Sequence, residues 1–309
     1  MIVGRYLTDW LAAARSSLRP STYRRYEQLV RVQIVPALGR ISLVKPSPAD
    51  IERFLASMLA AGASPQSAHH ARAVLRTALA RAVRHGLLTR NVAALAAAPK
   101  VERREVQVLS PDEVHRLFEV AADDRLEALY VLAVATGARQ GELLALTWPD
   151  IDLDAATLRI RAAMQRVNGK LTRVEPKTAR SRRTVVLARV AVQALREHRT
   201  RQLQERLWAG SRWQDHGLVF ARAIGTPLDG TAVTPAFQAL LATAGLPRIT
   251  FHALRHTAAS LLLAQGVHPR VVMEQLGHST IALTMNTYSH VMPALERDAA
   301  DRMDVALGR

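Results

Sequence analysis

The chain has 309 residues and a formal net charge of +16, because 42 residues are Lys or Arg and only 26 are Asp or Glu. This length is enough for two domains with their own cores, and a positive excess of this size favours a polyanionic partner. The absence of cysteine excludes disulfides, thiolate metal sites and a thiol nucleophile.

No stretch of the sequence is typical of a membrane span or a secretion signal. The longest apolar run, Ala128 to Ala138, is far shorter than a bilayer requires. Asp9 and Trp10 follow the first residues, where a signal peptide would continue as an apolar run. We therefore expect a cytoplasmic protein with no membrane partner.

Residues 1–98 carry the start and stop signals of a helical domain. Serine caps with proline at the first helical position, and glycine just past the end, recur along this region. The expected helices lie, in chain order, around Leu7–Leu18, from a cap at Ser21 to a stop at Pro36 and Gly39, from Ser47 to Gly62, from Ser64 to Gly86, and at Asn91–Ala97.

Residues 99–107 are polar and lack periodicity, which is typical of a linker, and residues 108–309 form the second domain. A capping box at Ser110 and Glu113 opens that domain. It is predicted to be mainly α with a small β insertion. The expected strands are Thr157–Met164 and Leu171–Val174 around the turn Asn168-Gly169, and then Arg183–Leu187.

The chain ends in a predicted tail helix. Its apolar stripe recurs every four residues, at Leu295, Ala299, Met303 and Leu307.

Arg139 follows a glycine that interrupts an apolar helix, in the segment Thr136-Gly137-Ala138-Arg139. A solvent-facing arginine is the usual interpretation. Apolar residues on both sides nevertheless favour a buried, oriented guanidinium. Glu142 lies three residues further on and can hold its fork in place.

His252 and Arg255 are three residues apart on a predicted helix and so share a face. The simpler interpretation is a histidine packed in the core and an arginine on the surface, with no shared catalytic role. Zinc is a rival because His256 is four residues from His252, but Ala253 stands where a metalloprotease has glutamate, and no thiolate is present. We therefore expect no metal.

Lysine is rare, and its four positions are 45, 100, 170 and 177. A general acid toward a departing 5′ oxygen must lose its proton, which a desolvated lysine can do and arginine cannot. Lys177 lies in a turn after the predicted hairpin, and Lys170, in the hairpin turn, is the competing choice.

Together with His278 and Tyr288, these residues have the chemistry of a phosphodiester site. Two arginines suit the phosphate oxygens, histidines move or donate protons, and a tyrosine can form a stable phosphodiester intermediate. On its own, Tyr288 on an amphipathic helix would more often belong to a core.

The segments that carry these residues closely resemble the tyrosine recombinases, the phage integrase family. The resemblance spans most of residues 105–292 in the family's order and spacing. It rests on Leu132 to Leu153, the Lys177 turn, His-Ala-Leu-Arg-His-Thr from His252, and Leu-Gly-His-Ser-Thr from Leu276 through Thr-Tyr-Ser-His.

The resemblance implies a helical-bundle core-DNA-binding domain followed by a catalytic domain with the DNA breaking-rejoining fold. Arginines along the first domain are then expected to contact double-stranded DNA at core recombination sites: Arg24, Arg25, Arg72, Arg76, Arg81 and Arg84. Many phage integrases have a further N-terminal domain for arm-type sites, whereas Met1 leads almost directly into the helical domain, so arm-site regulation is not expected.

The resemblance also implies roles in site-specific recombination by a phage or mobile-element enzyme in a bacterial cytoplasm. Tyr288 attacks the phosphate and forms a 3′-phosphotyrosyl link, while Arg139 and Arg255 bind the non-bridging oxygens. His252 accepts the tyrosyl proton, Lys177 protonates the leaving oxygen and His278 donates a hydrogen bond.

The resemblance further implies that no cofactor is required, because the phosphotyrosine conserves the energy of the broken bond. Exchange through a Holliday junction implies a homotetramer on two DNA sites, with accessory DNA-bending or directionality proteins as further partners.

Two rival functions use related features. A topoisomerase or hairpin-forming resolvase acting on one duplex would need nearly the same residues, but the two-domain layout and motif order favour recombination. A catalytically silent DNA-binding module would be expected to lose at least one of the six residues, and none is lost.

Overall fold

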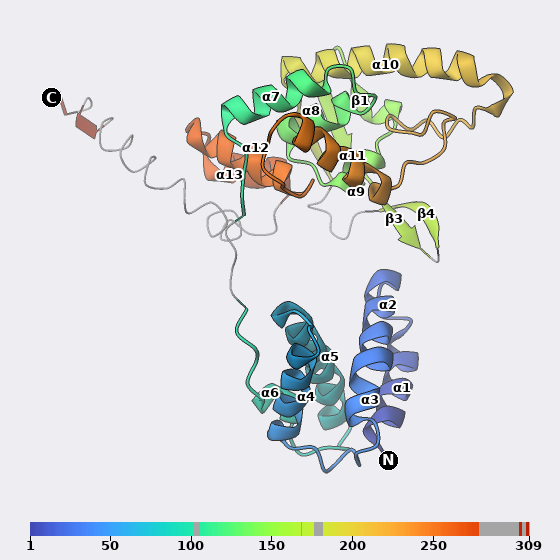
Figure 1. Ribbon diagram of the computed structural model, residues 1–309, viewed down its shortest axis with the longest axis vertical. Coiled ribbons are helices and arrows are strands. Elements are labelled where there is room, and N and C mark those ends of the chain that lie inside the picture. Colours follow the sequence, from blue (N-terminus) through green and yellow to red (C-terminus); the bar gives the residue numbers. More distant parts are fainter. Residues whose placement is uncertain (102–105, 168, 176–181, 278–302, 305–306, 309) are drawn as a thin grey trace. The chain divides into compact units, whose positions relative to one another are not determined.

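The computed structural model describes residues 1–101, 106–167, 169–175, 182–277, 303–304 and 307–308. The chain divides into two units, residues 1–104 and 105–309 (Figure 1). The division falls within the predicted linker, of which residues 102–105 lie outside the described residues. None of the helices in the described ranges is long and apolar enough to cross a membrane.

Over residues 1–101, the regular structure of the first unit is helical apart from an isolated bridge between Ile2 and Ser42. Its elements are α1 (Val3–Ala14), α2 (Pro20–Leu29), the π-helical turn η1 (Val30–Ile34), α3 (Val35–Leu38), α4 (Pro48–Ala60), α5 (Pro65–Arg84) and α6 (Val92–Leu95).

The predicted helix starts at Ser47, Ser64 and Asn91 are confirmed, since each side chain accepts a backbone N–H of its own helix. The first two helices differ from the prediction. The first begins at Val3, and the second begins at Pro20, so Ser21 lies inside it and is not its cap.

Pro36 does not stop the second helical segment, contrary to the sequence prediction. A proline lacks an N–H and crowds the carbonyl four residues earlier in an α-helix. Here the π turn η1 directly precedes it, with the Val35 N–H bonded to the Val30 carbonyl. This wider turn accommodates the proline, and the helix runs on to Leu38.

Side chains from all the long helices of the first unit share one core. Within it, the Tyr6 hydroxyl on α1 donates to the Ala78 carbonyl on α5 (2.7 Å), and the rings of Trp10 and Tyr26 stack. The core therefore packs α1, at the start of the unit, against α5, near its end.

The second unit is mainly helical with a small β insertion, as expected. Its elements are α7 (Pro111–Ala121), α8 (Glu127–Thr136), α9 (Gln140–Leu144), η2 (Trp148–Asp150), β1 (Ile151–Asp152), β2 (Thr157–Ile160), β3 (Ala163–Val167), β4 (Lys170–Val174), β5 (Arg183–Val186), α10 (Arg189–Ala209), η4 (Gly210–Arg212), α11 (Gly230–Thr243), α12 (Ala253–Ala264) and α13 (Pro269–Leu276).

The β insertion forms two separate antiparallel sheets. The predicted hairpin is confirmed, because β3 and β4 pair antiparallel with Val167 opposite Lys170. The predicted strand Thr157–Met164 is wrong as a single element. It breaks at Arg161, whose Nε donates to the buried Asp150 carboxylate (2.8 Å). Only its first half, β2, pairs with β1 and β5.

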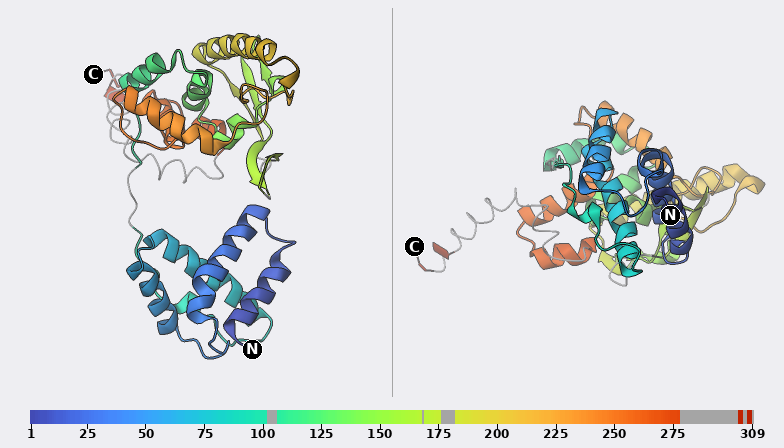
Figure 2. Two further views of the ribbon diagram at one scale, coloured as in Figure 1. Left: turned by 45° about the vertical axis from the view of Figure 1, so that its right-hand side comes forward. Right: turned by 90° about the horizontal axis from the view of Figure 1, so that it is seen from below.

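Helix α8 is the centre of the second unit. Almost all of its residues are buried, and α10 and α12 both pack against it. Figure 2 shows α10 and the β3–β4 hairpin at the outside of this unit.

The end of α8 is fixed by Gly137. Its φ is +62°, a left-handed conformation that favours glycine. A Cβ at this position would lie 2.3 Å from Leu276 Cδ2 on α13 and 3.3 Å from Ala258 Cβ on α12. Three helices therefore meet where α8 ends, two residues before Arg139.

We expect Gly137→Ala to lower the free energy of unfolding by about 2–4 kcal/mol, because it adds left-handed strain to an overlap with Leu276. Gly169→Ala is the matched control, since Gly169 also has a positive φ (+81°) but nothing within 4 Å of its added Cβ. It should cost only about 1 kcal/mol. Urea denaturation measures both values, and equal losses would contradict this account of Gly137.

Candidate active site

Arg139 and Arg255 lie on either side of the chain reversal at Gly137. Arg139 is the residue before α9, and Arg255 lies in the first turn of α12. The Arg255 side chain is buried, and its NH1 donates to the Gly137 carbonyl (2.8 Å). The end of α8 thus holds the Arg255 guanidinium two residues before Arg139, although the two arginines are far apart in sequence.

Glu142 holds Arg139 as the sequence predicted. Its Oε1 accepts from Arg139 NH1 (2.7 Å), and its Oε2 accepts from the Arg139 backbone N–H (3.0 Å). The Glu142 side chain is 5% exposed, whereas that of Arg139 is 42% exposed. A buried carboxylate therefore orients an arginine whose own side chain stays partly exposed to solvent.

The second partner of Glu142 was not predicted. Arg183, at the start of β5, donates from NH2 to Glu142 Oε2 (3.0 Å). Sequence reasoning missed it because Arg182 and Arg183 are adjacent, and nothing in their spacing says which is buried. In the structure the Arg182 side chain is 57% exposed and that of Arg183 is 7% exposed.

The two arginines keep Glu142 ionised. Burial alone would raise the pKa of this carboxyl group. The charge and hydrogen bond of Arg183, followed by the backbone N–H and charge of Arg139, outweigh burial and hold the pKa of Glu142 below its usual value. The carboxylate is negative at neutral pH.

His252 precedes α12 instead of lying within it, so the predicted helix begins one residue later than expected. His252 is exposed to solvent. Even so, the protein around the ring desolvates it and lowers the pKa of His252, and the charges of Arg255 and Arg139 lower it further. The imidazole is therefore neutral at pH 7 and can accept a proton.

His256 lies edge-on to His252, with ring centroids 5.2 Å apart. Burial, His252 and Arg255 lower the pKa of His256 to about 4. In the described ranges, no three His, Asp or Glu side chains are grouped to hold a metal ion.

Three of the six predicted catalytic residues, Lys177, His278 and Tyr288, lie outside the described residues. The same is true of Leu295 and Ala299 in the predicted tail helix. The competing lysine, Lys170, is exposed at the start of β4. Helix α13 ends at Leu276, two residues before His278.

The arginines predicted to contact DNA differ in their surroundings. Arg24, Arg76 and Arg84 are exposed, and Arg81 is half-buried. Arg25 contacts the His70 ring. Arg72 donates to the carbonyls of Ala94 and Ala96 (3.1 and 2.6 Å), so its guanidinium already serves the end of α6.

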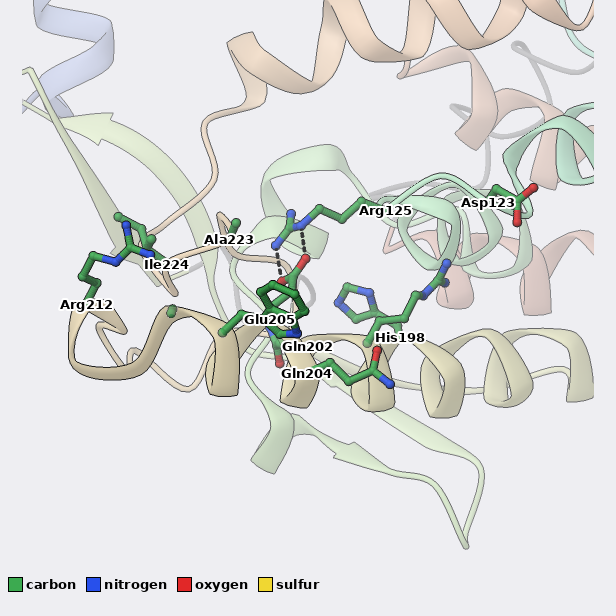
Figure 3. A pocket seen from close by; sticks show the side chains of 12 residues that line it. Asp123, Arg125, His198, Gln202, Gln204, Glu205, Arg212, Ala223 and Ile224 are labelled. Carbon is green, nitrogen blue, oxygen red and sulfur yellow. Dashed lines mark hydrogen bonds and ion pairs between the residues drawn. The ribbon is translucent and has the colours of Figure 1, made fainter.

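A cavity of about 540 Å³ beside α10 is separate from these residues. Figure 3 shows its lining, in which Arg125 and Glu205 pair across the wall (NH2–Oε2 2.7 Å). None of the predicted catalytic residues in the described ranges lines it.

Residues 107–294 match the profile of the phage integrase family, and residues 3–59 match the phage integrase N-terminal SAM-like domain. The chain belongs to the phage integrase family. It is a tyrosine-type site-specific recombinase, and the resemblance seen in the sequence is confirmed.

Among its relatives, a tyrosine recombinase XerC-like protein of Caldanaerobacter subterraneus is 34% identical and an integrase of Saccharopolyspora erythraea is 31% identical. Each match covers 98% of this chain and 82% of the relative. The integrase of Mycobacterium phage D29 is 28% identical, over 99% of this chain and 79% of the phage protein.

Two groups of solved structures share the fold. The Tn1549 transposon integrase in complex with a circular intermediate DNA has a TM-score of 0.80 at 21% identity, covering 96% of this chain and 99% of the other. A lambda integrase dimer bound to a COC′ core site has a TM-score of 0.68 at 21% identity, covering 93% and 77%. The predicted two-part recombinase fold is thus confirmed.

We expect His252 to stay neutral as the pH falls through 6.5, the ordinary value for histidine, and to protonate only at lower pH. Imidazole ¹⁵N chemical shifts measure this, with the signal assigned from a His252→Gln variant. Because the Glu142 charge opposes the shift, Glu142→Gln should lower the pKa of His252 further. Titration at or above 6.5 in the unaltered protein would contradict the description.

Proposed function

We propose that the chain cleaves and rejoins double-stranded DNA at specific core sites with Tyr288 as the nucleophile. The observation that carries the proposal is the pair of oriented guanidiniums, Arg139 and Arg255, held beside a neutral His252. Donors fixed before the substrate arrives stabilise the charge that develops on a phosphate without further reorganisation.

In the proposed reaction, the Tyr288 oxygen bonds to the phosphorus as the bond to the 5′ oxygen breaks. His252 takes the phenolic proton, and Lys177 gives a proton to the departing 5′ oxygen. Arg139 and Arg255 bind the non-bridging oxygens, and His278 donates a hydrogen bond to the phosphate. A 5′ hydroxyl from a second duplex reverses these steps, so no cofactor is needed.

Strand exchange between two duplexes requires four copies of the chain and a Holliday junction. We infer a homotetramer on two core sites, with the tail helix of residues 294–309 docking on a neighbouring copy. Accessory DNA-bending or directionality proteins and a location in the bacterial cytoplasm belong to the same proposal.

Five exposed or half-buried arginines of the first unit are proposed to contact the core site: Arg24, Arg25, Arg76, Arg81 and Arg84. Arg72 is the weakest member of the originally predicted set, because two carbonyls at the end of α6 occupy its guanidinium.

Tyr288→Phe should bind core-site DNA normally but form no covalent adduct, because the phenolic oxygen is the proposed nucleophile. The measurement uses a nicked suicide duplex, in which loss of a short strand traps the cleaved state. Its sequence is to be taken from a repeated core site, sought by sequencing the DNA that flanks the gene. An adduct that survives the substitution would refute the assignment.

Lys177→Ala should cleave an ordinary phosphate poorly but cleave a 5′-bridging phosphorothiolate well, since a thiolate leaves without an acid. Lys170→Ala is the matched control, and its cleavage of both substrates should resemble that of the unaltered protein. If the sulfur substrate rescues Lys170→Ala instead, Lys170 and not Lys177 is the general acid. Equal impairment of Lys177→Ala on both substrates would leave it with a binding role only.

A further inference from the structure

One buried arginine, Arg183, connects separate parts of the candidate active site. Its NH2 donates to Glu142 Oε2 (3.0 Å), and its Nε donates to the Gln275 carbonyl (2.6 Å) in the last turn of α13. Arg183 therefore lies between the carboxylate that orients Arg139 and the helix that directly precedes His278 in the sequence.

The backbone at the end of α13 lies very close to the Arg183 guanidinium. Gly277 has a φ of +67°, and a Cβ added there would lie 3.0 Å from Arg183 NH1 and 3.3 Å from its Cζ. Glycine is thus favoured both by its left-handed backbone and by the close approach of Arg183. The side chain is confined on two sides, by α9 and by α13.

Arg183 also sets the charge of the cluster. Arg139 and Glu142 alone would cancel, whereas Arg183 restores one net positive charge. Arginine keeps that charge at every relevant pH. The side chains of Glu142 and Arg183 are 5% and 7% exposed, so Arg139, at 42%, is the member of the cluster that presents this charge to a substrate.

We propose that Arg183 is a positioning residue for DNA cleavage. It holds the Glu142 carboxylate in place and offsets its negative charge. Glu142 can then orient the Arg139 guanidinium toward the scissile phosphate without cancelling the positive charge of Arg139. This inference rests on the proposed function, because it concerns the same phosphate.

A purely structural role of Arg183, joining β5 to α13, makes a different prediction. A structural defect lowers cleavage of any substrate equally. A charge-setting role depends on the negative charge of the scissile linkage. A methylphosphonate linkage has a methyl group in place of one non-bridging oxygen and carries no charge, so it separates the two roles.

The test is single-turnover cleavage of the suicide duplex with either a phosphate or a methylphosphonate at the scissile position. Relative to the unaltered protein, Arg183→Met should be slower by about tenfold or more on the phosphate, and by less than about threefold on the methylphosphonate. Equal losses on both substrates, or no loss on the phosphate, would overturn the proposal.

Arg270→Met is the matched control, because it removes the same charge from an exposed ion pair with Glu274 on α13 (Nε–Oε1 2.8 Å). Its rates on both substrates should stay close to those of the unaltered protein. A loss like that of Arg183→Met would show that net charge alone explains the effect.

Two further variants keep the proposal testable if Arg183→Met does not fold. Glu142→Gln combined with Arg183→Met removes both charges of the buried pair and leaves Arg139 with the same net charge, so its stability and phosphate cleavage should exceed those of Arg183→Met. Arg183→Lys keeps the charge without the fork and should lose less on the phosphate than Arg183→Met. A double variant no better than the single one, or a lysine variant impaired equally on both substrates, would contradict the proposal.

The unaltered protein separates this inference from the proposed function. If it forms no Tyr288-dependent adduct on any core-site duplex, the proposed function fails. If it forms the adduct while the Arg183 variants are impaired equally on both substrates, only the inference about Arg183 fails.

Discussion

A buried negative charge constrains the second unit of this recombinase. The Glu142 side chain is 5% exposed, and an isolated carboxylate so placed would carry a large desolvation penalty. Arg139, which precedes Glu142 in the sequence, and Arg183, which follows it, both offset that penalty. Removing one partner of a buried pair typically costs about 3–5 kcal/mol, so the folded state favours the arrangement that also directs Arg139 outward.

Gly137 positions Arg255, the second arginine proposed to bind the phosphate. Its left-handed conformation ends α8, and its carbonyl accepts from Arg255 NH1 (2.8 Å). Because α12 and α13 also approach this glycine closely, helix packing and arginine placement depend on one residue. Both donors are thus held by buried groups, Glu142 for Arg139 and the Gly137 carbonyl for Arg255, which suits a reaction in which the protein stabilises charge on a phosphate.

Sequence reasoning succeeded where the interaction is local. The Arg139–Glu142 pair spans three residues and the hairpin turn two, so their spacing alone predicts them. It failed where the partner is remote: Arg183 is 41 residues from Glu142, and only tertiary packing distinguishes it from Arg182. The break between β2 and β3 had the same origin, since Arg161 pairs with Asp150. The prediction that the helix stops at Pro36 was wrong because nothing in the sequence indicates the π turn before it.

The most direct test of the central claim is a structure of the Tyr288→Phe protein bound to a core-site duplex with an intact scissile phosphate. Arg139 and Arg255 should both lie within hydrogen-bond distance of the non-bridging oxygens of that one phosphate. Glu142 should still bridge Arg139 and Arg183. Guanidiniums bound to different phosphates, or a Glu142 carboxylate turned away from both arginines, would contradict the account.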